Sequence, residues 1–165
     1  MSLKEDTAVV DEKKCTICGA CVDSCKFDAI KLEEKETESG VDLSAYEGIW
    51  VLAEQRDNEL LDVSLELVSE GRKLADQLDT DLTAVMLGSE VKEAASELVA
   101  YGADKVYIAE DERLKDYQTG PYTRVISDLV EAEKPEILLL GATNNGRDLG
   151  PRVSNRVEAG LTADC

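Results

Sequence analysis

A run of four cysteines near the start of the chain is the feature that could do chemistry. The run consists of Cys15, Cys18, Cys21 and Cys25, so successive cysteines are separated by two, two and three residues. The fifth cysteine of the chain is its last residue, Cys165. Four thiols this close together crowd the backbone around one point, which ordinary packing does not require. We therefore expect these four side chains to hold a metal centre.

The spacing favours an iron–sulfur cluster over zinc. The pattern C-x2-C-x2-C-x3-C presents thiolates to the corners of a [4Fe-4S] cubane from one tight loop. A structural zinc site usually takes its thiolates as two C-x2-C pairs with a longer spacer, which is missing here. Gly19 and Ala20 would let backbone N–H groups approach the sulfurs. Apolar residues that would cover a cluster are Ile17, Val22, Phe27, Ala29 and Ile30.

Cys25 is the ligand that the sequence leaves open. In two-cluster ferredoxins the fourth cysteine of such a run is followed by Pro and serves the other cluster. Here Lys26 follows Cys25, and the chain has no second cysteine run. We therefore predict one [4Fe-4S] cluster that Cys25 completes. The alternative is a cluster held by three cysteines, with one open iron.

Composition and charge favour a soluble globular protein and disfavour nucleic acid and membranes as partners. Hydrophobic residues make up 43% of the 165 residues and charged residues 33%, as in soluble globular proteins. The formal net charge is −18, so nucleic acid and anionic membranes are poor partners. We find no apolar run of membrane-spanning length and no apolar leader, so we expect neither membrane insertion nor a signal peptide. Thiols committed to a metal site then indicate the cytoplasm.

Strand and helix patterns alternate from about residue 46 onward. Short apolar runs typical of buried strands lie at 48–53, 81–87, 105–109 and 136–140, and a fifth could start at 161–164. Helical spacing occurs at 57–78, 91–101, from Pro121 on, and at about 148–158. The repeats predict an α/β fold: a Rossmann-like parallel sheet with flanking helices, preceded by a small ferredoxin-like iron–sulfur module.

We divide the chain into three parts on this basis. Residues 1–36 form the iron–sulfur module, in which 7–10 and 30–32 are expected to be short strands that bracket the cysteine loop. Residues 37–45 belong to a polar, charged stretch without periodicity and form a linker. Residues 46–165 form the α/β domain.

A glycine-rich turn at the end of the fourth strand is a second candidate site. It runs from Gly141 through Arg147 to Gly150. Open α/β sheets bind ligands at the carboxyl ends of their strands, and a helix N-terminus suits an anion, which Arg147 could reinforce. The turn matches neither G-x-G-x-x-G nor a P-loop. A plain turn is therefore the alternative, with Asp148 and Arg152 as an i,i+4 ion pair on the helix that follows.

Catalytic residues cannot be singled out. The chain has no histidine, which removes the commonest general base and any Ser-His or Cys-His relay. The carboxylates are numerous but scattered, so hydrolytic chemistry is poorly supported.

Two segments near the end of the chain form a distinctive pair of motifs: G-A-T with G-R-D-L-G-P-R-V, at 141–143 and 146–153, and G-L-T-A-D-C, at 160–165. Together they resemble the N-terminal domain of the electron transfer flavoprotein alpha subunit. They occur together at the family's spacing, and the opening G-I-W-V-L-A-E at 48–54 also fits. The cysteine module resembles the ferredoxin-like extension of some alpha subunits from anaerobes that perform flavin-based electron bifurcation.

The resemblance implies an electron-carrier subunit rather than a stand-alone enzyme. Its [4Fe-4S] cluster would relay single electrons between the flavin of an electron transfer flavoprotein and ferredoxin or a partner flavin dehydrogenase of lactate or acyl-CoA type. The chain would form a heterodimer with the beta subunit, in a ferredoxin- and NAD-linked bifurcating complex. In the family a FAD-binding domain follows, outside these residues, so FAD is expected in the full-length complex and not in this chain alone.

A second hypothesis belongs to another class of protein. The glycine-rich turn could bind a nucleotide, and the cysteines could hold a structural zinc ion. The chain would then be a nucleotide-binding α/β module.

Overall fold

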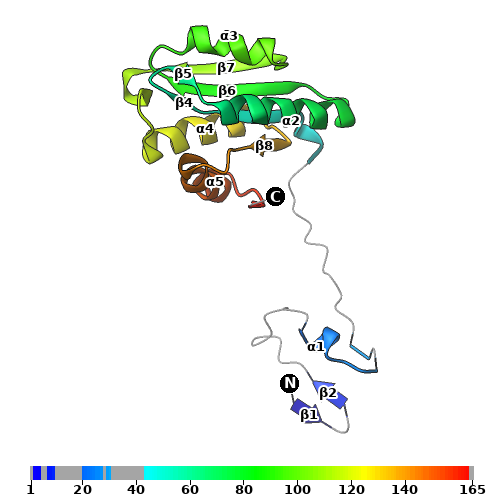
Figure 1. Ribbon diagram of the computed structural model, residues 1–165. Coiled ribbons are helices and arrows are strands. Elements are labelled where there is room, and N and C mark those ends of the chain that lie inside the picture. Colours follow the sequence, from blue (N-terminus) through cyan, green and yellow to red (C-terminus); the bar gives the residue numbers. More distant parts are fainter. Residues whose placement is uncertain (1, 5–6, 10–19, 28, 31–42, 164–165) are drawn as a thin grey trace. The chain divides into compact units, whose positions relative to one another are not determined.

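The computed structural model describes residues 2–4, 7–9, 20–27, 29–30 and 43–163. The chain divides into two units, Met1–Asp42 and Leu43–Cys165, and each is described here by itself (Figure 1). Cys15, Cys18 and Cys165 lie outside the described residues.

The described residues of the first unit form a small antiparallel pair of strands and one short helix. Strand β1 (Ser2–Lys4) pairs with β2 (Thr7–Val9), and helix α1 spans Ala20–Asp23. The predicted strand at 7–10 is confirmed over Thr7–Val9, where it pairs with β1. Ile30 lies outside any strand, and residues 31 and 32 are not among the described residues. Two strands separated by two residues pair at a low entropic cost of loop closure, which favours the local partner.

The second unit is built on a parallel sheet. Its strands lie in the order β7-β6-β3-β8, and all three neighbouring pairs are parallel. The strands are β3 (Ile49–Ala53), β6 (Leu82–Gly88), β7 (Lys105–Glu110) and β8 (Ile137–Leu139). All four predicted strands are therefore confirmed, as is the α/β class. β8 is only half-buried because it lies at the edge of the described sheet.

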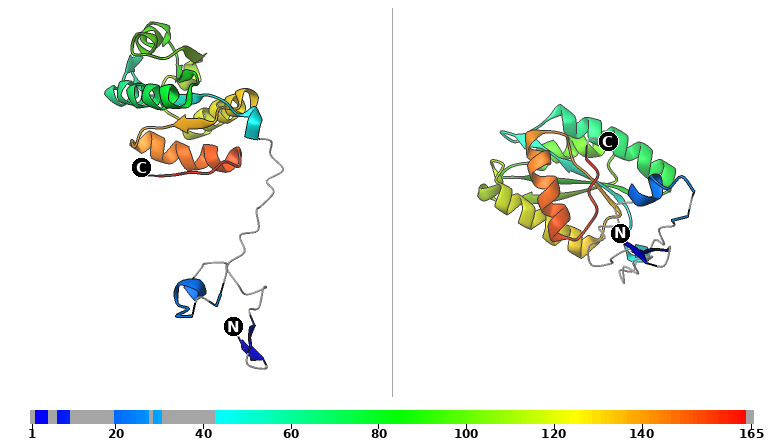
Figure 2. Two further views of the ribbon diagram at one scale, coloured as in Figure 1. Left: turned by 90° about the vertical axis from the view of Figure 1, so that its right-hand side faces the viewer. Right: turned by 90° about the horizontal axis from the view of Figure 1, so that it is seen from below.

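Helices cover both faces of this sheet, as Figures 1 and 2 show. Helices α2 (Asp62–Leu78) and α3 (Lys92–Ala100) pack on one face. Helices α4 (Thr119–Glu133) and α5 (Asn144–Arg156) pack on the other. The described part of this unit also contains two short 3-10 helices, η1 (Leu43–Ala45) and η2 (Glu112–Leu114). Along the central strand β3, alternate side chains enter the two cores, which is why all five of its residues are apolar and buried.

A small hairpin occupies the place where the sequence predicts the start of the first helix. Strands β4 (Gln55–Arg56) and β5 (Glu59–Leu60) pair across Asp57 and Asn58, whose φ angles are 54° and 66°. Two central residues with positive φ characterise a type I′ turn, and Asp and Asn tolerate that conformation. The prediction of a helix from residue 57 was therefore wrong by five residues, since α2 begins at Asp62.

Two further boundaries differ from prediction. Helix α5 begins at Asn144 rather than near 148, because Thr143 caps its N-terminus. Residues 161–163 form no strand, and residues 164–165 are outside the described part. No helix in the described part of the chain is long and apolar enough to cross a membrane.

Candidate functional site

Two of the four candidate ligands lie in the described part of the first unit. Cys21 is exposed on α1, and Cys25 is half-buried just after it. The backbone N–H of Cys25 donates to the Val22 carbonyl at 3.1 Å, which closes a turn between the two cysteines. The structure does not describe Cys15 or Cys18, so it does not show whether the four sulfurs converge.

The surroundings of the Cys25 sulfur suit a metal ligand. Its Sγ accepts a hydrogen bond from the backbone N–H of Ala29, with N and S 3.4 Å apart. Backbone N–H groups, first that of Phe27 and then that of Ala29, lower the pKa of the Cys25 thiol. The thiolate is the form that binds metal, and N–H groups directed at sulfur tune iron–sulfur clusters. The donor set at this position therefore fits a cluster ligand.

Phe27 departs from the expectation that it covers a cluster. Its side chain is 88% exposed. Val22 and Ile30 are half-buried, whereas Ala29 is exposed.

In the second unit, the turn after β8 is joined to the end of β3 by a buried acid. Glu54 directly follows β3 and is only 7% exposed. The Thr143 hydroxyl donates to Glu54 Oε1 at 2.7 Å and accepts from the backbone N–H of Gly146 at 3.0 Å. One hydroxyl thus caps α5 and holds the carboxylate at the N-terminus of that helix.

Ser64 of α2 fixes the backbone of the same acid. The Glu54 N–H donates to Ser64 Oγ at 2.8 Å, and the Ser64 hydroxyl donates back to the Glu54 carbonyl at 2.8 Å. Ser64 is fully buried. Our sequence reasoning assigned no role to either residue. The available signals were the position of Glu54 immediately after a buried strand and its place at the end of the G-I-W-V-L-A-E segment.

The glycines of the turn are required by close packing. A Cβ on Gly141 would lie 2.9 Å from Glu54 Oε1, and one on Gly146 would lie 1.9 Å from the Gly141 carbonyl oxygen. The turn therefore fits the plain structural alternative. Arg147 is exposed on the first turns of α5.

Asp148 ties α5 to the loop before α4. Its Oδ2 accepts from the hydroxyls of Tyr117 at 2.7 Å and Thr119 at 2.6 Å. Its Oδ1 accepts from Arg152 Nε at 3.1 Å, which confirms the predicted i,i+4 pair. Hydrogen bonds from Thr119 and then Tyr117 lower the pKa of Asp148 to about 2. Burial, followed by the bond to Asp148, raises the pKa of Tyr117 to about 12.

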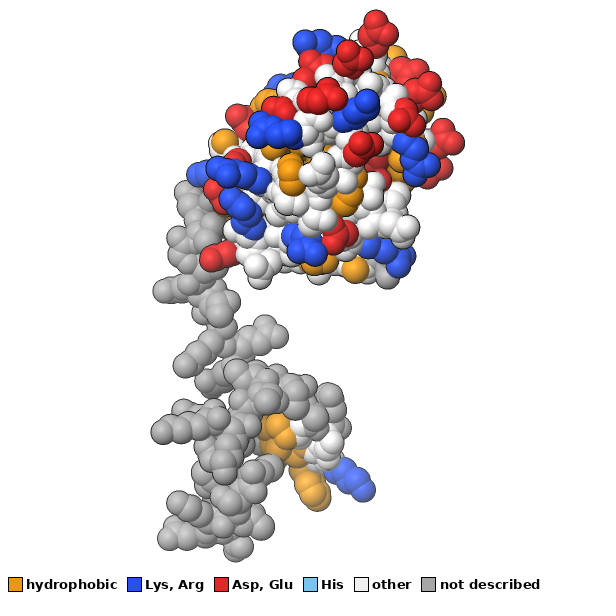
Figure 3. Space-filling view, turned by 90° about the vertical axis from the view of Figure 1, so that its left-hand side faces the viewer, with side chains coloured by type: hydrophobic (Ala, Val, Ile, Leu, Met, Phe, Trp, Pro, Cys, Tyr) orange, Lys and Arg blue, Asp and Glu red, His pale blue; other side chains and the backbone are white. Residues whose placement is uncertain are grey.

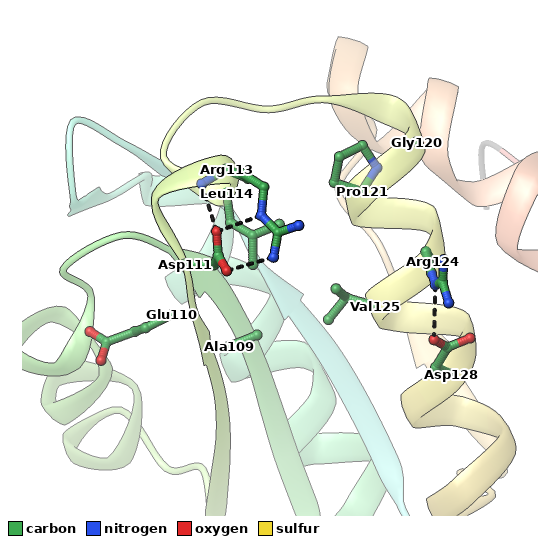
Figure 4. Close-up of a pocket in the computed structure, with 10 residues that line it drawn as sticks. All are labelled: Ala109, Glu110, Asp111, Arg113, Leu114, Gly120, Pro121, Arg124, Val125 and Asp128. Carbon is green, nitrogen blue, oxygen red and sulfur yellow. Dashed lines mark hydrogen bonds and ion pairs between the residues drawn. The ribbon is translucent and has the colours of Figure 1, made fainter.

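A cleft of about 600 Å³ opens between the end of β7 and helix α4 (Figure 4). Its rim carries two ion pairs, Asp111 with Arg113 at 2.8 Å and Arg124 with Asp128 at 3.6 Å. Apolar side chains between them are Ala109, Leu114, Pro121 and Val125. Since both arginines already face carboxylates, the cleft has no clear preference for an anion. Acidic and basic side chains are likewise interspersed over the face of the second unit seen in Figure 3.

Comparison with protein families identifies both parts of the chain. The model of the electron transfer flavoprotein domain matches residues 49–165. The chain belongs to the electron transfer flavoprotein family. The model of a 4Fe-4S binding domain matches residues 8–31, which include the whole cysteine run.

Three curated relatives are similar to this chain over most of the chain's length. The acryloyl-CoA reductase electron transfer subunit beta of Anaerotignum propionicum is 50% identical over 77% of this chain and 35% of its own. The electron transfer flavoprotein subunit alpha of Megasphaera elsdenii is 50% identical over 76% of this chain and 37% of its own. Subunit LctC of the lactate dehydrogenase (NAD(+),ferredoxin) of Acetobacterium woodii is 38% identical over 92% of this chain and 36% of its own.

These matches differ in how much of the chain they include. The similarity to LctC covers 151 residues, compared with 127 and 125 for the other two relatives, so it extends further into the cysteine-bearing unit. In every case the chain spans about a third of the length of the relative.

Proposed function

We propose that this chain is an electron-carrier subunit that relays single electrons between a bound [4Fe-4S] cluster and the flavin of a full-length electron transfer flavoprotein. The observation that carries the proposal is that one chain combines a 4Fe-4S binding match over residues 8–31 with an electron transfer flavoprotein match over 49–165. A cluster supplies one-electron chemistry when it is bound, and the chain's task is to hold it and tune it.

The proposed ligands are Cys15, Cys18, Cys21 and Cys25. Support comes from their spacing and from the N–H groups that favour the thiolate of Cys25. The proposed division of the chain is an iron–sulfur module at 1–36, a linker at 37–45 and the α/β domain at 46–165. We assign FAD to the full-length complex and no flavin contact to this chain.

The proposed partners are an electron transfer flavoprotein beta subunit, ferredoxin and a flavin dehydrogenase of lactate or acyl-CoA type, in a bifurcating complex. The names of two relatives support this choice. One belongs to a lactate dehydrogenase that uses NAD(+) and ferredoxin, and the other to an acryloyl-CoA reductase.

The nucleotide-binding module with structural zinc finds less support. The family match over the cysteines is to a 4Fe-4S domain. In addition, the helix N-terminus that suggested an anion site already holds the carboxylate of Glu54.

Anaerobic purification of the full chain tests the proposal. We expect a brown protein with broad visible absorption, about four irons per chain and an EPR signal after dithionite reduction. A colourless protein that holds one zinc ion would rule the proposal out.

Cysteine variants test the ligand set. Cys25→Ala should lose the four-iron cluster, because one corner of the cubane loses its thiolate. Cys165→Ala is the matched control: it removes the fifth cysteine and should retain about four irons per chain. A Cys25→Ala protein with unchanged iron content and EPR spectrum would favour the three-cysteine cluster with an open iron.

A further inference from the structure

The topology of the second unit places a potential ligand crevice beside Glu54. From β3 the chain continues outward through β6 and β7 and then returns to β8, on the other side of β3. Open α/β sheets bind phosphate-bearing ligands outside the carboxyl ends of the two strands at such a reversal. Here those ends are followed by Glu54 on one side and by the turn from Gly141 to Gly146 on the other.

The position that an external anion would take in this crevice is held by the chain's own carboxylate. Glu54 Oε1 accepts from Thr143, the N-cap of α5, at 2.7 Å. A helix N-terminus favours a negative charge, which the chain supplies from its own sequence. The carboxylate also leaves no space at Gly141, where an added Cβ would lie 2.9 Å from it.

Side chains of this chain also make hydrogen bonds at the carboxyl ends of β6 and β7. The Gln55 side-chain N–H group donates to the Leu87 carbonyl at 3.4 Å and to the Lys115 carbonyl at 2.9 Å. The backbone N–H of Val91, at the start of α3, donates to Glu110 Oε1 at 3.0 Å. A carboxylate of this chain, that of Glu110, therefore also lies at the N-terminus of α3.

We propose that Glu54 is a specificity-determining residue that excludes phosphate groups from the crevice between β3 and β8. Its carboxylate accepts a hydrogen bond from the Thr143 hydroxyl, lies 2.9 Å from the Cβ position of Gly141 and places a negative charge where a phosphate would otherwise meet the α5 N-terminus. The sheet thereby keeps the reversal of strand order at which open α/β sheets bind ligands, while a carboxylate of the chain lies there. The inference concerns the second unit alone and is independent of whether the cysteines hold a cluster.

Titration of the full chain with inorganic phosphate and with AMP tests this role, with the amide NMR signals of Thr143 and Gly146 as the readout. The wild-type chain should show no saturable shift. Glu54→Ser removes the charge and most of the volume but leaves a hydroxyl group, and should raise phosphate affinity at least about tenfold. Glu54→Gln keeps the shape and can still accept from Thr143, so it should show a smaller gain.

The control is Glu59→Ala, which removes one exposed carboxylate from the neighbouring hairpin and should leave phosphate binding unchanged. Saturable binding by the wild type, with an affinity equal to that of Glu54→Ser, would overturn the proposal. So would a folded Glu54→Ser chain that binds no better than the wild type. If Glu54→Ser fails to fold, Glu54→Gln decides the question, and an affinity no higher than that of the wild type would refute the role of the charge.

Discussion

At the scale of single residues, Asp148 shows what a motif residue does in this domain. It belongs to the G-R-D-L segment by which the chain resembles its family. Its carboxylate accepts hydrogen bonds from the hydroxyls of Tyr117 and Thr119 and from the guanidinium of Arg152. These contacts join two segments about 30 positions apart, so the motif residue supports the fold rather than a reaction.

The coupling between Asp148 and Tyr117 predicts a change in alkaline titration. The pKa of Tyr117 is raised to about 12, above the ordinary value of about 10 for tyrosine. The neutral Tyr117 hydroxyl therefore contributes fully to the stability of the folded chain below pH ~10. This contribution is lost as the pH rises from there towards 12. Asp148→Asn removes the neighbouring charge and should lower the pKa of Tyr117, although burial keeps it above 10.

Ultraviolet difference spectra of the tyrosinate bands measure this shift, and Tyr117→Phe identifies the band. Asp128→Asn is the control, because its carboxylate on α4 faces Arg124 and Arg156 instead. Equal Tyr117 midpoints in wild type and Asp148→Asn would show that burial alone sets the pKa.

At the scale of elements, the start of α5 depends on two glycines in contact. Gly146→Ala would place a methyl group 1.9 Å from the Gly141 carbonyl oxygen, a backbone atom that cannot move without displacing the turn. We expect a loss of about 2–4 kcal/mol in the free energy of unfolding. Gly160→Ala is the matched control, since nothing lies within 4 Å of its Cβ position, and should change stability by less than about 0.5 kcal/mol.

Urea unfolding measures both variants through the fluorescence of Trp50, the only tryptophan of the chain, which is 4% exposed. A Gly146→Ala chain as stable as Gly160→Ala would mean that α5 can shift away from the turn.

The β4–β5 hairpin predicts a second effect at this scale. Asn58 has a φ of 66°, and its Oδ1 accepts from the Ser89 hydroxyl at 3.3 Å and from the Glu90 N–H at 3.4 Å. Asn58→Ala should cost about 1–2 kcal/mol, since alanine resists the left-handed conformation and the two bonds are lost. Asn58→Gly should cost less, because glycine adopts that φ freely. Equal losses in the two variants, measured by urea unfolding, would assign the whole effect to the side-chain bonds.

At the scale of the whole molecule, the second unit contains a complete hydrophobic core of its own. Both buried clusters consist of residues between Ile49 and Val153, on the two faces of one sheet. The metal-binding chemistry belongs to a separate stretch of sequence, residues 8–31. Stability of the α/β domain and occupancy of the cluster are thus expected to depend on different parts of the chain.

Removal of the metal tests this separation. Treatment of the brown protein with a chelator under mild oxidation should bleach the visible absorption. It should leave the unfolding midpoint reported by Trp50 unchanged, because the described residues that form the buried cluster with Trp50 all belong to the second unit. A lower midpoint in the bleached protein would show that the cluster also stabilises the α/β domain.

Local patterns predicted most of the second unit correctly. Apolar runs gave the four strands of the parallel sheet, since a strand covered on both faces has few polar side chains. The hairpin after β3 was missed because helical periodicity was extended back across Asp57 and Asn58, two residues that favour a tight turn. The pairing of β1 with β2 was missed because an apolar run does not identify its partner strand.

The sequence by itself indicated an iron–sulfur centre, the α/β class and the family resemblance, because each depends on residues close together along the chain. Only the tertiary structure showed that Glu54 lies against the turn after β8. Glu54 lies 10 positions from Ser64 and 89 from Thr143. Glu54 and Thr143 meet because parallel strands bring their carboxyl ends to one edge of the sheet. Strand order and register decide that the residue after β3 lies beside the turn after β8. The turn that suggested a site for an external anion therefore contacts the acid that follows the neighbouring strand, β3.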